Sequence, residues 1–173
     1  MPEKNDAAAG GQEFVLTRTF PAPRELMFRL WTEPAHLQQW MSPKGFTVLV
    51  ANMDLRPGGV YHYGMRGPDG SEMWGKWLIR EVVPPERLVW LNGFSDAAGG
   101  LTRHPMAPDW PQWMLSVITF TEDQGRTTVT LRWSPFEASE AERQVFAAAH
   151  AGMTQGWGGT MEQLEAYLAL ARS

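Results

Sequence analysis

The chain contains no cysteine among its 173 residues, and this absence excludes several kinds of chemistry at once. Without thiols there is no disulfide, no cysteine nucleophile and no thiolate ligand for a metal. Residues 1–12 also lack the basic start and apolar core of a secretory signal. We therefore expect a cytoplasmic protein, with residues 1–12 as a flexible tail ahead of one domain over residues 13–173.

Runs of like charge and long apolar runs are missing too. The 15 Lys and Arg residues are scattered among 19 Asp and Glu, which gives a formal net charge of −4. Proteins that bind nucleic acid or an anionic membrane surface usually carry a basic patch, and crossing a bilayer takes about 20 consecutive apolar residues. We expect neither nucleic acid nor a membrane as a partner.

The spacing patterns of most catalytic and cofactor sites are absent as well. The four histidines stand singly, with no HxH or HExxH pair, and no serine lies in a G-x-S-x-G context. The glycine-rich segments 57–59 and 156–159 match neither phosphate-loop pattern. We expect no metal and no cofactor.

General acid–base catalysis is the one enzymatic route that the residues leave open. A carboxylate or imidazole in an apolar cavity has a shifted pKa and can move a proton. The candidates for this role are His62, Glu72, Asp54 and His104. His104 lies on the long connection over residues 95–112, for which a lid above a cavity and a solvated loop are both open readings.

Large apolar side chains are plentiful instead, with nine tryptophans and ten methionines. From Phe46 to Trp133, short β-branched and aromatic segments separated by turn signals predict an antiparallel meander, with a hairpin turn at residues 123–125. A strand over residues 13–20 and two short helices are predicted before it, with Thr32 capping the second helix. A long helix is predicted after it, so the order indicates an α+β fold.

The predicted last helix, from residue 138 onward, contains four glycines at positions 152, 156, 158 and 159. Each glycine costs a helix about 0.5–1 kcal/mol relative to alanine. Gly152, Gly156 and Gly159 fall on one narrow face, beside Trp157 on the helical wheel. Room for a ligand and close approach of the helix to a sheet are both open explanations. Ser139 and Glu142 have the spacing of a capping box at the start of this helix.

Several segments, in the same order along the chain, resemble one known family. Residues 17–67 begin TRTFPAPRELMFRLWTEPAHLQQW, and the further matches are EVVPPERLVW (81–90), TRHPMAPDWP (102–111) and GMTQGWGGTMEQLEAYL (152–168). They resemble the branch of the SRPBCC, or START-like, superfamily named for the activator of the heat-shock-protein-90 ATPase (AHSA-type). The resemblance implies a helix-grip fold, similar to START domains and the birch-pollen allergen. In this fold a curved antiparallel sheet of six to seven strands packs on a long C-terminal helix around an apolar cavity, with two short helices after strand 1.

The implied cavity leads us to expect a small hydrophobic or aromatic ligand as the partner. Two alternatives stay open: a cofactor-free enzyme of cyclase, aromatase or hydrolase type, similar to polyketide cyclases, and a chaperone- or protein-interaction module. The family resemblance also allows a homodimer. Period-2 alternation places Tyr61, Tyr63 and Met65 on one strand face, opposite His62 and Arg66. The residues predicted to contact the ligand are Trp31, Trp40, Tyr61, Tyr63, Met65, Trp77, Trp113, Trp133, Met153, Gly156, Trp157 and Met161.

Overall fold

The computed structural model describes residues 13–42, 44–104 and 107–171, so the predicted tail over residues 1–12 lies outside the described residues. The strands are β1 (Phe14–Phe20), β2 (Thr47–Met53), β3 (Val60–Arg66), β4 (Glu72–Val83), β5 (Arg87–Ser95), β6 (Leu101–Thr102), β7 (Met114–Asp123) and β8 (Arg126–Pro135). The helices are α2 (Arg24–Thr32), α3 (Pro34–Trp40), α4 (Glu140–Ala148) and α5 (His150–Ala171). In the described part of the chain, no helix is both long and apolar enough to cross a membrane.

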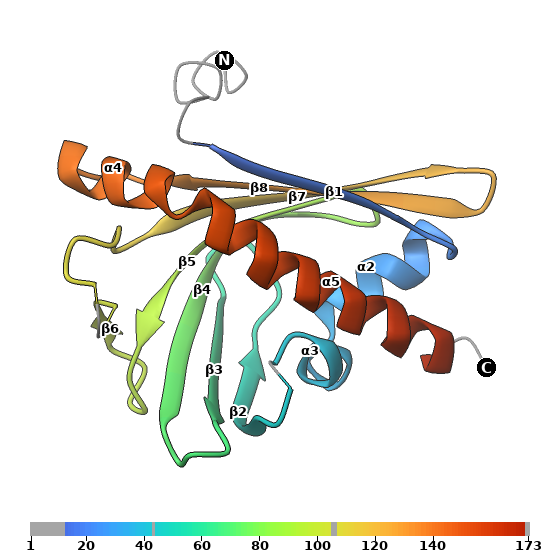
Figure 1. Ribbon diagram of the computed structural model, residues 1–173. Coiled ribbons are helices and arrows are strands. Elements are labelled where there is room, and N and C mark those ends of the chain that lie inside the picture. Colours follow the sequence, from blue (N-terminus) through green and yellow to red (C-terminus); the bar gives the residue numbers. More distant parts are fainter. Residues whose placement is uncertain (1–12, 43, 105–106, 172–173) are drawn as a thin grey trace.

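The strands form one antiparallel sheet in the order β1-β8-β7-β5-β4-β3-β2, and the short strand β6 pairs with β5. Figure 1 shows that this sheet is strongly curved and that α5 runs obliquely across its hollow side. The predicted arrangement of a curved antiparallel sheet with a long C-terminal helix is confirmed. The difference from the predicted element order is β6, which forms inside the segment predicted as a long connection.

Turn chemistry accounts for the strand connections. Gln124 and Gly125 join β7 to β8 with φ values of 52° and 75°, as a two-residue hairpin turn of type I′ requires. This confirms the hairpin predicted at residues 123–125. Gly58 and Gly70, in the turns after β2 and β3, also have φ of 88°, a conformation that glycine adopts without steric cost.

The two short helices close one end of the fold around a tryptophan pair. Trp31 and Trp40 are fully buried and meet edge to face with ring centroids 4.8 Å apart, and the Trp40 indole N–H donates to the Leu30 carbonyl. The predicted cap at Thr32 is wrong, because Thr32 is the last residue of α2 and its hydroxyl donates to the Phe28 carbonyl. Glu33 precedes α3 in extended conformation instead.

The C-terminal helical region differs from the single helix expected. The capping box of Ser139 and Glu142 is present, with both of its hydrogen bonds. The helix is interrupted at Ala149, where φ is −92° and ψ is 1°, so that α4 and α5 are separate elements.

The C-terminal half of α5 is attached to the body of the protein by polar contacts with β1 and α3. Arg18 of β1 forms an ion pair with Glu165 at 3.0 Å. The Gln163 amide donates to the carbonyl oxygens of Trp40 and Ser42 at 2.8 and 2.9 Å. A further hydrogen bond of 2.7 Å joins α3 to Tyr167 through the ring of His36. These contacts fix where α5 lies relative to the sheet.

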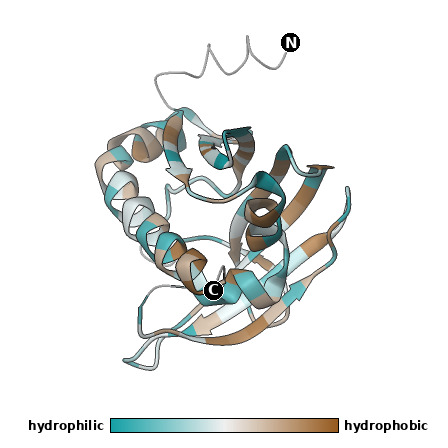
Figure 2. Cartoon of the chain, turned by 90° about the vertical axis from the view of Figure 1, so that its right-hand side faces the viewer, coloured by the Kyte–Doolittle hydropathy of each residue, from teal (hydrophilic) through white to brown (hydrophobic). Residues whose placement is uncertain are grey.

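The face of α5 formed by Gly152, Gly156 and Gly159 serves neither close approach to the sheet nor room inside the fold. The buried side chains of the helix are Met153, Met161, Leu164 and Leu168. At 100° per residue, Gly156 lies about 140° from Met161 around the helix, and Gly152 about 180°. A Cβ atom built at any of the four glycines meets nothing within 4 Å. The glycine face therefore points to solvent. Figure 2, coloured by hydropathy, shows hydrophilic and hydrophobic residues alternating along α5.

We predict that Gly156→Ala raises the free energy of unfolding by about 0.5–1 kcal/mol, because the helix gains propensity and no neighbour has to move. For a chain of this size the gain corresponds to a melting temperature about 2–4 °C higher per kcal/mol. Gly59→Ala is the matched control and should lower the melting temperature, because its Cβ would overlap the Asp54 carbonyl oxygen. A loss of stability in Gly156→Ala would contradict the solvent-facing placement.

Candidate functional site

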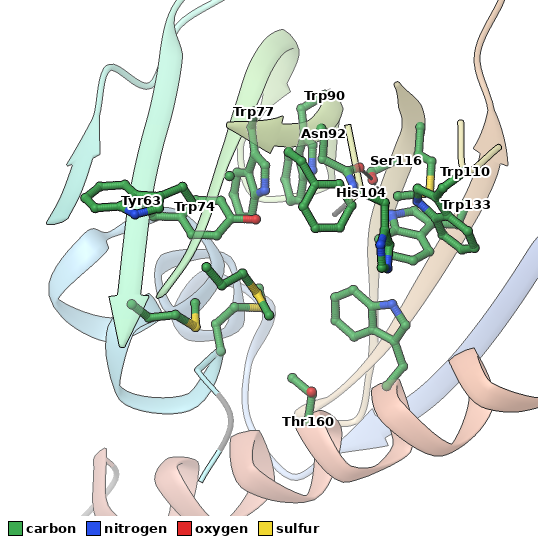
Figure 3. Close-up of a pocket in the computed structure, with 18 of the residues that line it drawn as sticks. Tyr63, Trp74, Trp77, Trp90, Asn92, His104, Trp110, Ser116, Trp133 and Thr160 are labelled. Carbon is green, nitrogen blue, oxygen red and sulfur yellow. Dashed lines mark hydrogen bonds between the residues drawn. The ribbon is translucent and has the colours of Figure 1, made fainter. Parts of the chain in front are cut away.

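A cavity of about 360 Å³ lies between the hollow side of the sheet and α5 (Figure 3). Five strands, the segment before β7 and the helix all contribute to its wall. The residues that line it are Met41, Tyr63, Met65, Met73, Trp74, Gly75, Trp77, Trp90, Asn92, Gly93, Phe94, His104, Trp110, Met114, Ser116, Leu131, Trp133, Trp157 and Thr160. Most of these side chains are aromatic or methionine, and none of the described lining residues is Lys, Arg, Asp or Glu. The cavity is therefore predominantly apolar and aromatic.

Aromatic side chains on neighbouring strands build the wall by stacking. Trp77 of β4 and Trp90 of β5 lie parallel, with centroids 3.9 Å apart and planes 5° from parallel. Tyr63 extends across Gly75 on the next strand, and a Cβ atom at Gly75 would overlap its phenol. Such contacts stabilise each ring beyond the burial of its surface. They also fix the rings relative to one another, so the aromatic wall is rigid.

On the helix side, Trp157 contacts aromatic rings from two directions. It meets Trp133 of β8 edge to face at 5.5 Å and stacks on Trp31 of α2 at 6.4 Å. One indole therefore connects α5 to the core and borders the cavity at the same time.

Methionines supply the more adaptable part of the lining. Met73 is 42% exposed and also lines the cavity, so the space opens to solvent beside the start of β4. Met41 and Met65 belong to the same lining. Because the unbranched methionine side chain adopts many shapes at low cost, this part of the wall can adjust to an occupant.

The segment after β6 is fastened over the cavity by an ion pair. Arg103 contacts the Glu142 carboxylate of α4 at 2.7 Å. The backbone N–H of Ser139 and the Arg103 guanidinium both hold the pKa of Glu142 below its ordinary value. His104, the next residue, meets Phe94 edge to face at 4.9 Å, and Trp110 lies 6.0 Å from His104. The loop thus contributes two rings to the cavity wall, while Asp109 is exposed.

A short chain of hydrogen bonds is the main polar feature of the cavity. The Trp133 indole N–H donates to the Ser116 hydroxyl at 2.5 Å, and Ser116 donates to the Asn92 side-chain oxygen at 2.5 Å. Asn92 and Ser116 are both buried. Figure 3 shows these three side chains grouped with His104 and Trp110 on one side of the cavity, away from Tyr63.

The pKa values of two tyrosines on β3 are raised well above their ordinary range. Burial raises the pKa of Tyr63 to about 12, with a hydrogen bond to Trp77 acting in the opposite direction. Burial also raises the pKa of Tyr61, and the neighbouring Tyr63 adds to that effect. Both phenols therefore stay protonated near neutral pH, so neither serves as a base there.

Five of the residues predicted to contact a ligand do line the cavity: Tyr63, Met65, Trp77, Trp133 and Trp157. They come from three strands and α5, and the structure brings them around one space. Tyr63 and Met65 are on the strand face predicted from alternation.

The other predicted ligand contacts lie elsewhere. Trp31, Trp40, Met153 and Met161 belong to the buried core, because they pack where α2, α3 and α5 meet the sheet and leave no surface to the cavity. Tyr61, on the same face as Tyr63, borders instead a second space of about 20 Å³.

Two further predicted contacts are displaced for reasons of local geometry. Trp113 packs against Gly93, on the side of β5 opposite Asn92 and Phe94. Gly156 lies on the exposed side of α5, where it borders a surface depression beside Lys44.

Of the four acid–base candidates, only His104 borders the cavity. A ring nitrogen of His62 contacts the Asp96 carbonyl oxygen at 3.0 Å, and its ring stacks on Trp74. Glu72 pairs with Arg66, which lowers its pKa. Asp54 pairs with Arg56 at the surface. In the described part of the chain, no group of three or more His, Asp or Glu side chains lies together as a metal site would need.

Sequence reasoning missed two polar residues of the lining, Asn92 and Ser116. The signal was present in β5, where Trp90, Asn92 and Phe94 alternate on one face and the central residue interrupts an aromatic row. Ser116 carries no comparable signal, because its partners Asn92 and Trp133 come from two other strands.

Comparisons with known proteins agree with the architecture. The family model described as "Activator of Hsp90 ATPase homolog 1-like protein" matches residues 21–169. A solved structure from Mycobacterium smegmatis is 30% identical, with a TM-score of 0.73 and 92% of each chain covered. One from Nitrosomonas europaea is 27% identical, with a TM-score of 0.71, covering 94% of this chain and 97% of the other. No curated protein sequence matches the chain.

A third solved structure shows the likeness of fold at lower identity. The AHSA1 protein from Silicibacter pomeroyi is 21% identical, with a TM-score of 0.66, and 92% of this chain and 99% of that chain are covered. The helix-grip fold inferred from the sequence is thus confirmed.

We predict that the free energy of unfolding falls as pH rises above about 10, the ordinary tyrosine value. In that range the unfolded chain has lost phenol protons that the folded chain retains, so unfolding becomes easier until the folded pKa of Tyr63, about 12, is reached. Urea denaturation at about pH 8 and about pH 11 measures the decline. The double variant Tyr61→Phe/Tyr63→Phe should show a smaller decline, and an equal decline in both proteins would contradict the assignment.

Proposed function

The chain belongs to the family described as Activator of Hsp90 ATPase homolog 1-like protein, and from this premise we propose that it binds a small hydrophobic or aromatic molecule in its cavity. The observation that carries the proposal is a space of about 360 Å³ with an aromatic and methionine lining. Small-molecule sites typically measure about 300–1,000 Å³ and are mainly apolar with a few placed polar groups. This cavity has both properties.

The energy of binding comes from surface taken out of water. Each Å² of apolar surface buried contributes roughly 25 cal/mol, and a flat ring placed against the Trp77 and Trp90 wall gains aromatic contacts as well. Because these tryptophans are held by stacking and by strand pairing, little of that energy is lost to ordering the site. Met73 at the opening and Met41 elsewhere in the lining provide the adjustable part.

An enzyme that uses an acid or base in the cavity remains the second candidate, and one observation favours it. His104 is the one acid–base candidate from the sequence that borders the space, beside Phe94 and Trp110. A proton-transfer role requires a substrate atom within about 3 Å of the imidazole. The chaperone-interaction alternative rests on the family description alone, whereas the binding proposal rests on the described residues themselves.

Two threonines on α5 offer a matched test of the binding proposal. Thr160 lines the cavity, whereas Thr154, six residues earlier on the helix, is exposed. Both hydroxyls donate to the carbonyl oxygen four residues back, at 3.1 and 3.0 Å. The two positions therefore share their local helix chemistry and differ in whether they face the space.

We predict that Thr160→Phe weakens binding of the neutral fluorescent probe N-phenyl-1-naphthylamine at least about tenfold, because the new ring occupies the cavity. Thr154→Phe should bind the probe as the unchanged protein does. Fluorescence titration gives the affinities, and circular dichroism checks that both variants are folded. No binding to the unchanged protein, or equal binding by both variants, would overturn the proposed function.

A further inference from the structure

Asn92 is the one amide side chain in the described lining of the cavity, and its setting is unusual. It is 9% exposed and lies in the middle of β5, between Trp90 and Phe94 on the same strand face. An amide buried among aromatic rings is costly unless its hydrogen bonds are satisfied. Its side-chain oxygen is satisfied by Ser116, as described above.

The amide nitrogen of Asn92 is left without a partner. No hydrogen bond among the described residues uses it, although the nitrogen carries two N–H donors. In the described chain, two side-chain polar atoms are both fully enclosed and without a hydrogen-bond partner: the indole nitrogens of Trp31 and Trp110. The Asn92 nitrogen is not one of them. The Asn92 nitrogen, which also lacks a partner, therefore keeps contact with open space, and the space that Asn92 borders is the cavity.

The hydrogen-bond chain decides which end of the amide faces the cavity. An indole nitrogen only donates, so the Ser116 oxygen accepts from Trp133. Ser116 is fully buried, and among the described residues its hydroxyl proton has no acceptor other than Asn92, so Asn92 presents its side-chain oxygen to Ser116. The amide nitrogen consequently points away from Ser116. Ser116 and Trp133, on two other strands, therefore fix the Asn92 amide nitrogen as the group that can donate to the cavity.

We propose that Asn92 determines specificity by donating a hydrogen bond to a neutral acceptor, such as a carbonyl oxygen, on an aromatic or apolar ligand; this inference rests on the proposed function. Ser116 and Trp133 act as positioning residues. The acceptor is neutral because the described lining holds no Lys or Arg to pair with an anion, and burying an unpaired carboxylate costs several kcal/mol.

Tyr63 is the competing polar group and lies on the other side of the cavity (Figure 3). Its oxygen accepts from the Trp77 indole and keeps both a proton to donate and a second lone pair, so Tyr63 sets no fixed preference for the ligand atom that it meets. Asn92, held through its oxygen, offers donors alone. This difference makes the two sites separable by experiment.

The test compares two compounds that share a planar skeleton, fluorene and 9-fluorenone, which differ by one carbonyl oxygen. We expect 9-fluorenone to bind about tenfold more tightly to the unchanged protein, as one well-placed hydrogen bond allows. Quenching of tryptophan fluorescence or calorimetry gives the affinities. Equal affinities would overturn the role of Asn92 and leave the proposed function standing, whereas binding of neither compound would overturn both.

Variants assign the preference to one side chain. In Asn92→Leu the ratio of the two affinities should fall from about ten to about one, because the donor is lost for both compounds. Tyr63→Phe is the matched control, because it removes a hydroxyl from the other side of the cavity and should keep the preference. Loss of the preference in Tyr63→Phe, or its retention in Asn92→Leu, would overturn the assignment.

A measurement on the unchanged protein covers the case in which Asn92→Leu fails to fold. The side-chain amide signals of Asn92 in a ¹H–¹⁵N spectrum should shift on addition of 9-fluorenone and much less on addition of fluorene. Similar shifts with both compounds would contradict the hydrogen bond.

Fluorene-9-carboxylate tests the charge of the acceptor, because it is an anion on the same planar skeleton. Tighter binding of this anion than of 9-fluorenone would contradict a neutral acceptor.

Discussion

The structure depends on where α5 is attached to the curved sheet. The Arg18–Glu165 ion pair, the hydrogen bonds of Gln163 and the contact of His36 with Tyr167 all lie in the C-terminal half of the helix. They hold that half against β1 and α3. The first half of α5 contributes Trp157 and Thr160 to the cavity wall. A straight helix fastened at one end cannot follow the curvature of the sheet, so a space remains beneath it.

Aromatic rings keep that space from closing. The Trp77–Trp90 stack and the Tyr63 ring over Gly75 are fixed by strand pairing, and Trp157 is fixed between Trp31 and Trp133. Side chains locked in this way cannot collapse into a void as a flexible aliphatic core does. The same rings that stabilise the fold therefore define the shape of the site. Stability and binding capacity arise from one set of contacts.

Chemical selectivity in such a cavity comes from very few atoms. Glu72 and Asp54 form ion pairs at the surface, and His62 contacts a backbone carbonyl oxygen. Three of the four acid–base candidates therefore have their partners away from the cavity. Near Asn92 the hydrogen-bond chain through Ser116 leaves one donor group directed at the space. An apolar wall discriminates weakly between similar molecules, whereas a fixed donor rejects those without an acceptor. Under the proposed function, Asn92 is therefore the residue that would distinguish one apolar ligand from another.

Local pattern in the sequence determined most strands and helices, the capping box at Ser139, the hairpin at Gln124 and Gly125, and the face shared by Tyr63 and Met65, because each depends on neighbours a few residues away. It did not determine β6 or the break between α4 and α5. Tertiary structure decided which large side chains fill the core and which border the cavity. Trp31 and Trp157 look alike in sequence, yet one is enclosed by the core and the other also faces the space. It also turned Gly152, Gly156 and Gly159 to solvent and joined Asn92, Ser116 and Trp133 from three strands. Such outcomes depend on sheet curvature and on contacts between residues distant in the chain, which periodicity along one element does not encode.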